Sequence, residues 1–343
     1  MNSFLILELI QMIIIIFTQN HLNALTIHTP PLGKKIVSIV FLLTSINFAD
    51  AQKIDGEYFN NLADAKIAFN TKKYELSISC YKKIIEPDSK PNIKIGLAEA
   101  YIFNGNIDSG YQIIKSLIEI GYFFLDGFKI NASFVGFSAD QLDMLKKLSE
   151  NNKELYIANQ KNPAMVDTLF KLFYEDQEVR RLITIAGEKY GSFSKEAMEI
   201  NTKMGLIDSI AFIFLQSMIK ERGILSIAEI GIEGSRVLFT MLQHTGEDFM
   251  IDIYPMVKNA YEKNQIAPIS FHFFQDRTFK YLNKPQIFGT QWKPDKTKKN
   301  TYKLYKLKNL KKANELRIKY GRLPLELNVK VLDSESDNIK YEL

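Results

Sequence analysis

The stretch YKKII at residues 81–85 and the stretch IKSLI at residues 114–118 carry apolar side chains in the same register, 33 residues apart. Ala65 and Ala98 are separated by the same 33 residues. Small residues at fixed positions allow paired helices to approach closely, and a period of about 34 residues is typical of helix–turn–helix repeats. The sequence therefore predicts two such repeats.

Each repeat is expected to hold two helices, because its apolar residues recur at helical spacing. The four helices are marked by Ala65–Phe69, Tyr74–Ile85, Leu97–Ile102 and Ile107–Ile118. Two repeats bury little apolar surface, so a third unit is expected at residues 121–148. Ser138 is a candidate N-cap for the helix of that unit.

Residues 54–150 therefore resemble tetratricopeptide repeats, and this resemblance implies stacked helix pairs that can bind a peptide or protein. A protein partner is the functional interpretation of the region. The alternative is that these helices form only a packing scaffold for the domain that follows. The sequence alone identifies no groove residue, so both interpretations stand.

An export signal is predicted near the N-terminus. Lys34 and Lys35 precede an apolar run at residues 36–43, and Ala49-Asp50-Ala51 has the spacing of a cleavage site. Residues 34–51 are therefore predicted to be a signal peptide of a periplasmic or secreted protein with no membrane span in its mature form. Residues 1–33 are expected to be a mis-annotated upstream extension, and the alternative is a two-part membrane anchor.

Composition limits the chemistry that the mature chain can perform. Hydrophobic residues make up 46% of the chain and charged residues 24%, which is typical of a globular protein. Cys80 is the only cysteine, so no intramolecular disulfide is expected. Removal of residues 1–51 leaves His244 and His272 as the only histidines, which argues against a multi-histidine zinc site. No phosphate loop or dinucleotide fingerprint is present, so no cofactor is expected.

A second, α-rich domain is predicted at residues 163–328, after a polar linker at 150–162 and before a tail at 329–343. Asn162 and Pro163 have the order of an N-cap followed by a first helical proline. Gly191 is expected to end that helix.

The remainder of this domain is expected to be helical with one small β element. The apolar segment 204–220 predicts a buried central helix. Alternation at residues 286–292 and 302–306 predicts a β-hairpin. The predicted fold class is mostly α, with tetratricopeptide-like repeats followed by an α-helical domain with a small β-hairpin.

Three residues of this domain are candidate catalytic groups. His244 closes a predicted helix, and Asp276 and Arg277 lie in an aromatic helix, where unpaired charges would be costly. In a hydrolase-like interpretation His244 is the general base, Asp276 or Asp176 orients it, and Arg277 stabilises developing negative charge. In the structural interpretation His244 is a helix C-terminal cap and Arg277 ties helices together.

Polar residues follow one another here in the order DQxxR, QH, DR, QxFGTQ and NxxR, within residues 169–325. This order resembles an uncharacterised bacterial domain family of unknown function, which often follows a signal peptide and helical repeats. Phe288 stands where the family pattern has Tyr, and Leu316 where a double Arg is usual. The resemblance implies no established activity. The candidate ligand-binding residues are Asp176, Gln177, Arg180, Gln243, Gln286, Thr290, Gln291, Asn314 and Arg317.

The segment Lys293–Arg322 contains twelve Lys or Arg against Asp295 and Glu315. Such a local charge attracts anionic polymers, so an anionic envelope ligand is one interpretation, and solvated surface lysines are the other. Nucleic acid is not expected as a partner, because the chain is predicted to be exported.

Two functions are compatible with these features. The first is an exported envelope protein without catalytic activity, in which the repeats bind a protein partner and the second domain recognises a ligand. The second is the hydrolase-like enzyme. The sequence contains no nucleophile elbow and no zinc motif, which favours the first.

Overall fold

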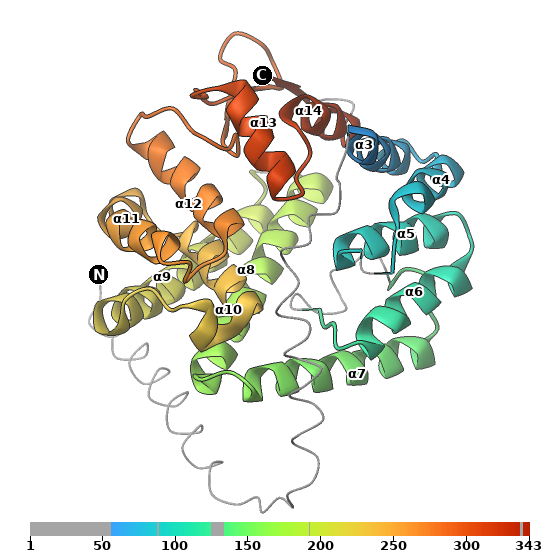
Figure 1. The fold of residues 1–343 in the computed structure, drawn as a ribbon, viewed down its shortest axis with the longest axis horizontal. Coiled ribbons are helices and arrows are strands. Elements are labelled where there is room, and N and C mark those ends of the chain that lie inside the picture. The colour runs from blue at the N-terminus through green and yellow to red at the C-terminus, as the bar shows by residue number, and fades with distance from the viewer. Residues whose placement is uncertain (1–55, 88, 125–133, 192, 337–338) are drawn as a thin grey trace, which may run out of the picture. The chain divides into compact units, whose positions relative to one another are not determined.

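The computed structural model describes residues 56–343, apart from residue 88, residues 125–133, residue 192 and residues 337–338 (Figure 1). The predicted upstream extension at 1–33 and the predicted signal peptide at 34–51 lie outside the described residues. The described chain is mostly helical with one small sheet, which confirms the predicted fold class.

The elements follow one another along the chain with these bounds. They are α3 Gly56–Asn70, α4 Tyr74–Ile84, α5 Pro91–Phe103, α6 Ile107–Glu119, α7 Ala139–Ala158, α8 Pro163–Tyr190, α9 Lys195–Arg222, α10 Ile227–Leu242, α11 Glu247–Glu262, α12 Pro268–Tyr281, β1 Trp292–Pro294, β2 Thr301–Leu304, α13 Leu310–Lys319, α14 Leu325–Ser334 and β3 Lys340–Glu342.

The first four helices form two packed pairs. Helix α3 packs against α4 and α5 against α6, and α4 joins the pairs by contacting α5. Ala65 and Ala98, which mark the repeat in the sequence, are completely buried in these contacts. The predicted helix–turn–helix geometry is therefore present, whereas the assignment to tetratricopeptide repeats stays a prediction.

Helix α7 runs through the segment that was predicted to be a linker. It begins at Ser138 with a capping box, in which Ser138 and Gln141 satisfy each other's backbone N–H groups. It continues to Ala158 because Leu145, Ser149 and Tyr156 face the protein while polar side chains lie on its other faces. The polar composition at 150–158 thus reflects the outer faces of a helix, and only residues 159–162 form the connection to α8.

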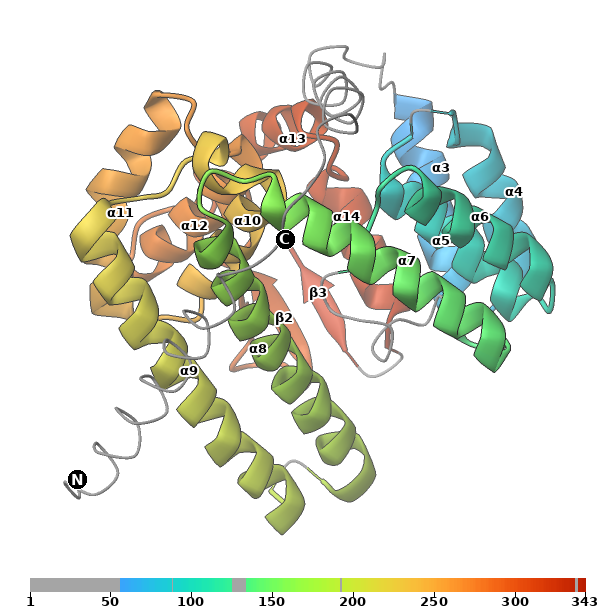
Figure 2. The same cartoon turned by 90° about the horizontal axis from the view of Figure 1, so that it is seen from below.

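Helices α8 and α9 form a long pair (Figure 2). Helix α8 begins after Asn162 with Pro163 in its first turn and ends before Gly191, as predicted. Residues 204–220 are helical as predicted, within α9, but the expected burial of this helix is wrong for its outer face. Leu215 is buried, but Leu206 and Ile213 lie on the outer face and are about half exposed.

Helix α9 is also long and apolar enough to cross a membrane by length and composition, a test that core helices of soluble proteins pass too. In this fold it packs against α8 and α10. The main apolar core of this part of the chain lies between α8, α9, α10, α11 and α12.

The sheet differs from the predicted hairpin in two respects. Strands β1 and β2 are antiparallel as predicted, with Trp292 opposite Leu304. Residues 286–291 are not a strand, because Gln286 forms only an isolated bridge to Leu307. Strand β3 adds to β2 in parallel, a pairing that the sequence did not indicate.

The C-terminal segment returns to the first repeat. Helix α14 packs against α3, and Leu323 and Val331 share a core with Phe59. The segment that was predicted to be a tail, residues 329–343, has regular secondary structure, since it contains the second half of α14 and strand β3. The predicted boundary at residue 328 falls inside α14 for the same reason.

Candidate acid–base site around His244

Helix α8 places an acid on its buried face. Val166, Leu169, Phe170 and Phe173 form the apolar stripe of this helix, and Asp176 continues the same stripe one turn later. Asp176 is only 2% exposed as a result. A buried carboxylate requires partners, and here they come from the same helix and from the turn after α10.

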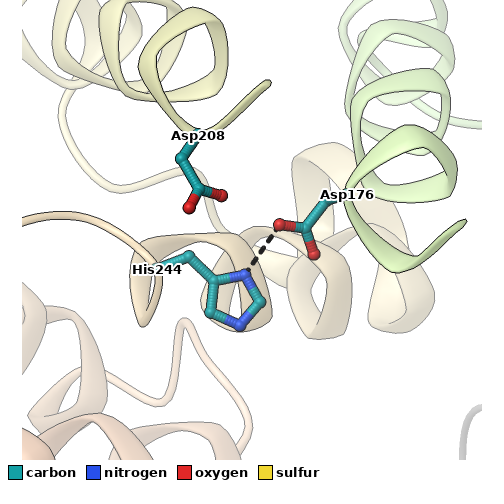
Figure 3. A group of neighbouring side chains, drawn as sticks. All are labelled: Asp176, Asp208 and His244. Carbon is teal, nitrogen blue, oxygen red and sulfur yellow. Dashed lines mark hydrogen bonds and ion pairs between the residues drawn. The ribbon is translucent and has the colours of Figure 1, made fainter. Parts of the chain in front are cut away.

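His244 is the first of these partners. Its Nδ1–H group donates to Oδ1 of Asp176 over 2.9 Å (Figure 3). The side chain of His244 is 22% exposed, whereas that of Asp176 is 3% exposed. A carboxylate on Nδ1 fixes the tautomer and the orientation of an imidazole and leaves Nε2 as the basic nitrogen. The two residues therefore form an oriented Asp–His dyad.

Arg180 is the second partner and connects two acids. Its Nε donates to Oδ1 of Asp176 over 3.0 Å, and its Nη2 donates to Asp208 of helix α9 over 2.6 Å. Gln177 donates to the other oxygen of Asp176 over 2.7 Å. The ion pair of Asp176 and Arg180 is therefore partly buried, because the side chain of Asp176 is 3% exposed and that of Arg180 is 30% exposed.

The two acids of this cluster have opposite pKa shifts. Burial by itself raises the pKa of Asp176, but hydrogen bonds and charges from His244 and Arg180 outweigh burial and lower the pKa to about 2. Burial raises the pKa of Asp208, and the charge of Asp176 raises it further against the effect of Arg180. Asp176 is thus the permanently ionised member, suited to holding the imidazole.

Arg277 reaches the same cluster from helix α12. Its Nη1 donates a short hydrogen bond to the carbonyl of Gln243, the residue before His244. Burial lowers the pKa of Arg277, and the nearby charge of Arg180 lowers it further. Gln243 itself acts through this carbonyl, since its side-chain amide donates to Phe239 in its own helix. The structure therefore brings together five of the candidate residues, namely His244, Arg277, Asp176, Gln177 and Arg180.

A metal ion is a possible occupant by donor type. One ligand atom each of Asp176, Asp208 and His244 lies within 4.8 Å of the others. The guanidinium of Arg180 already bridges the two carboxylates, and Nδ1 of His244 already donates to one of them. A cation there would displace Arg180 and deprotonate Nδ1, so the residues fit a hydrogen-bonded dyad better than a metal site.

Asp276 is a structural residue, which corrects its predicted catalytic role. Its carboxylate is fully buried and accepts the N–H groups of Ile287, Phe288 and Thr290 at 2.7 to 3.2 Å, and also the hydroxyl of Thr290. Asp276 and Arg277 are adjacent on α12 and project in different directions. The carboxylate that orients His244 is consequently Asp176.

Three predicted ligand-binding residues also build this loop. Gln286 accepts from the N–H groups of Thr290 and Gln291 and donates to the carbonyls of Gln291 and Tyr305. The amide of Gln291 donates to the hydroxyl of Thr290. These bonds hold Gly289 at a φ of 79°, which a glycine adopts without strain.

Asn314 and Arg317 hold the next turn. Asn314 accepts from the N–H of Leu325 and donates to Glu326. Arg317 is buried and donates to the carbonyls of Leu323, Phe288 and Gly289. Phe288 is fully buried and stacks on His272, with ring centres 5.2 Å apart. The missing Tyr hydroxyl of the family pattern would therefore lie inside the core and not at His244.

Asp208 is the site residue that sequence reasoning missed. It is the only charged residue between Met204 and Lys220, a segment that was interpreted as a buried central helix. An acid in such a segment needs a partner, and that signal was available. The partner, Arg180, lies on another helix, so only the packing of α8 on α9 identifies the pair.

Comparisons of the chain with models of protein families, with curated proteins and with solved structures found no match. Function is therefore argued from the geometry of the site.

Proposed function

We propose that the Asp176–His244 dyad is a general acid–base site of a hydrolase-like enzyme that acts on an anionic substrate. The observation that carries the proposal is the hydrogen bond from Nδ1 of His244 to Asp176, which makes Nε2 the basic atom. Nε2 takes a proton from water while the water oxygen attacks the substrate, and the resulting imidazolium returns the proton to the leaving oxygen. Arg277 stabilises the negative charge that develops.

The anionic character of the substrate is inferred from Arg277. Its guanidinium has five donors, and one of them is used on the carbonyl of Gln243, the residue before His244. A guanidinium suits a carboxylate or phosphate group. Arg180 is different, because both of its acidic partners neutralise it.

The proposal is tested with chromogenic esters, namely p-nitrophenyl acetate, phosphate and sulfate. The wild type is expected to hydrolyse an anionic ester above background, and His244→Ala to lose about 100-fold or more of that rate. Free imidazole is expected to restore part of the rate to His244→Ala, a rescue that a purely structural role would not give. Asp252→Asn, an exposed change on α11, is the control for Asp176→Asn.

Two results would contradict the proposal. One is the absence of turnover for all three esters, and the other is a rate that His244→Ala leaves unchanged in a folded protein. Circular dichroism of each variant separates loss of chemistry from loss of fold.

The second candidate is recognition of an anionic ligand without turnover. The hydrogen bonds from Arg180 to Asp176 and Asp208 favour this candidate. They tie α8 to α9, and a site without catalytic activity would also require them. The two candidates differ in one measurement. A recognition site binds the anion and leaves it chemically unchanged, and its affinity falls in Arg277→Gln. An enzyme converts the anion and releases a product.

We further propose that the chain is exported and that its helix pairs bind a protein partner. The signal at residues 34–51 supports export, and the stacked pairs α3–α4 and α5–α6 support a partner surface. The residues whose order resembles the uncharacterised bacterial family form two groups in this fold. Asp176, Gln177 and Arg180 with Gln243 and His244 build the site, and the rest frame the loop held by Asp276.

Binding of an anionic envelope ligand by the segment Lys293–Arg322 is a separate proposal. The fold reduces the number of basic side chains that are available for it. Arg317 is buried in hydrogen bonds, and Lys298 and Lys303 are paired with Glu342 and Asp295. The support that remains is a cavity of about 510 Å³ at the β1–β2 connection, whose lining includes Lys296 and Lys299.

A further inference from the structure

Asp208 stands at the far end of the hydrogen-bonded side chains that cross the candidate site. Nδ1 of His244 contacts Oδ1 of Asp176 over 2.9 Å, and Arg180 reaches the same oxygen with Nε and Nη2, each at 3.0 Å. Nη2 of Arg180 also donates to Oδ1 of Asp208 over 2.6 Å. The proposed acid–base reaction gives Asp208 no role, although Asp208 belongs to the same network.

Asp208 lies close to the imidazole as well as to Arg180. An oxygen of Asp208 and a ring nitrogen of His244 lie within 4.8 Å of each other. Figure 3 shows the carboxylates of Asp176 and Asp208 on the side of the ring that carries Nδ1. At this distance the charge of Asp208 acts on the imidazole through space, and Nε2 points away from it.

The charges around His244 balance only when Asp208 is counted. Asp176 and Arg180 form an ion pair whose opposite charges largely cancel. Arg277 adds a positive charge from α12, at the carbonyl of the residue before His244. The carboxylate of Asp208 offsets Arg180 through the 2.6 Å contact, so the negative charge of Asp176 remains available to the imidazole.

Two further acids follow His244 along the chain. Glu247 and Asp248 belong to the first turn of α11, and both are exposed, so water and salt screen their charges. The side chain of Asp208 is only 28% exposed and is therefore screened less. Of these three acids, Asp208 acts most strongly on the imidazole.

We propose that Asp208 is a positioning residue that sets the proton affinity of His244 through Arg180, and so determines the pH range in which the site works. The inference rests on the proposed acid–base function of the dyad. The negative charge of Asp208 stabilises the imidazolium, so Nε2 holds its proton more strongly. With an uncharged residue at position 208, Arg180 would act with its full charge on Asp176, and the imidazolium would release its proton at a lower pH.

The test is a pH titration of His244 by nitrogen NMR of the full, histidine-labelled protein, which requires no substrate. Asp208→Asn is expected to lower the pH at which His244 is half protonated by about one pH unit, because a unit charge within 4.8 Å of the ring is lost. Asp208→Glu keeps the charge and should titrate like the wild type. The two variants separate charge from shape, since Asn matches the shape of Asp and Glu does not.

Glu199→Gln is the matched control, because Glu199 is another acid of α9 and pairs with Lys195 at the surface. It should leave the titration of His244 unchanged. Arg180→Gln makes the opposite change in charge and should raise the pH of half protonation. This second variant tests the same charge balance if Asp208→Asn does not fold, which circular dichroism detects.

The proposal is overturned if Asp208→Asn titrates like the wild type, or if Asp208→Glu shifts the titration as far as Asp208→Asn. A lower pH of half protonation in Arg180→Gln would overturn it too. None of these results depends on turnover. Ester hydrolysis by the wild type and by His244→Ala tests the acid–base function, whereas the titration tests the role of Asp208, so the two failures are distinguishable.

Discussion

Two aspartates of the chain show how partners decide the role of a residue. Asp176 accepts hydrogen bonds from the side chains of His244 and Arg180, and therefore orients an imidazole. Asp276 accepts from backbone N–H groups at residues 287, 288 and 290, and therefore fixes a loop. Both residues are buried aspartates on helices, so the partners distinguish their roles.

Asp276→Asn is expected to destabilise the protein by about 3 kcal/mol. The asparagine amide keeps one acceptor oxygen, but its NH₂ group then faces backbone N–H groups that the carboxylate accepted. Hydrogen bonds to a charged group contribute roughly 1.5 to 3 kcal/mol. Urea unfolding measures the difference. Asp252→Asn, on the exposed face of α11, should stay within about 0.5 kcal/mol of the wild type. A similarly small effect at Asp276 would mean that the loop does not depend on it.

His272 is a buried histidine in the core beside Phe288. Neither ring nitrogen has a hydrogen-bond partner among the described residues, and the ring stacks on Phe288 with an interplanar angle of 7°. Burial lowers the pKa of His272, so the neutral form is the one that packs. The unfolded chain then binds a proton more readily than the folded chain.

Lowering the pH is therefore expected to reduce the unfolding free energy of the protein through protonation of His272. Stability from the neutral ring is complete above the unfolded pKa of about 6.5 and is lost as pH falls below it. His272→Phe keeps a stacking ring and removes the proton. Its urea unfolding should change less between pH values above and below about 6.5 than that of the wild type. Equal pH dependence in both proteins would contradict the packing of a neutral imidazole.

At the scale of elements, short-range signals predicted helix ends well. Ser138, the pair Asn162–Pro163 and Gly191 mark helix ends in the sequence, and each lies at one. These signals work because capping depends on residues within one turn. The continuation of α7 past residue 150 and the addition of β3 depend on distant partners, so local composition could not reveal them.

The candidate site was partly predictable from local sequence. His244 was selected because it closes a predicted helix, and Asp176 and Arg180 were selected from the ordered polar residues within 169–325. Which acid faces His244 depends on how α8, α10 and α12 pack, and the pattern in α12 alone did not separate Asp276 from Arg277. Asp208 was missed because its partner lies on the neighbouring helix.

Helix α10 contains a break that places His244. Gly231 has a φ of 69°, and a Cβ there would lie 2.2 Å from the hydroxyl of Tyr156. That hydroxyl accepts the N–H groups of Glu233 and Gly234, the first turn after the break. A side chain from α7 therefore caps the half of α10 that ends beside His244.

Tyr156→Phe is expected to cost about 1 to 2 kcal/mol of unfolding free energy, because two N–H groups lose their acceptor while the ring packing is kept. Urea unfolding again provides the measurement. Tyr190→Phe, an exposed tyrosine at the end of α8, is the matched control and should leave stability unchanged. An effect no larger than that of the control would show that water caps the break equally well.

At the scale of the whole described chain, the last helix completes the first core. Val331 on α14 is buried in the same cluster as Phe59 on α3, although they are far apart in the sequence. Contacts between such distant segments make local stability at one end depend on the other. The N-terminal repeat is therefore not an independent module.

Val331→Asp is expected to release α14 from α3, because an unpaired buried charge costs several kcal/mol. Hydrogen exchange should then speed up in α3 as well as in α14, while α8 and α10 keep their protection. Lys330→Asp, on the exposed face of the same helix, should leave α3 unchanged. Wild-type protection of α3 in Val331→Asp would show that the repeat folds without α14.

The measurement that most directly tests the dyad is nitrogen NMR of histidine-labelled protein, with the His244 signals assigned from His244→Gln. We predict that the neutral ring carries its proton on Nδ1 in the wild type and loses this preference in Asp176→Asn. A proton on Nε2, or a tautomer that Asp176→Asn leaves unchanged, would contradict the account.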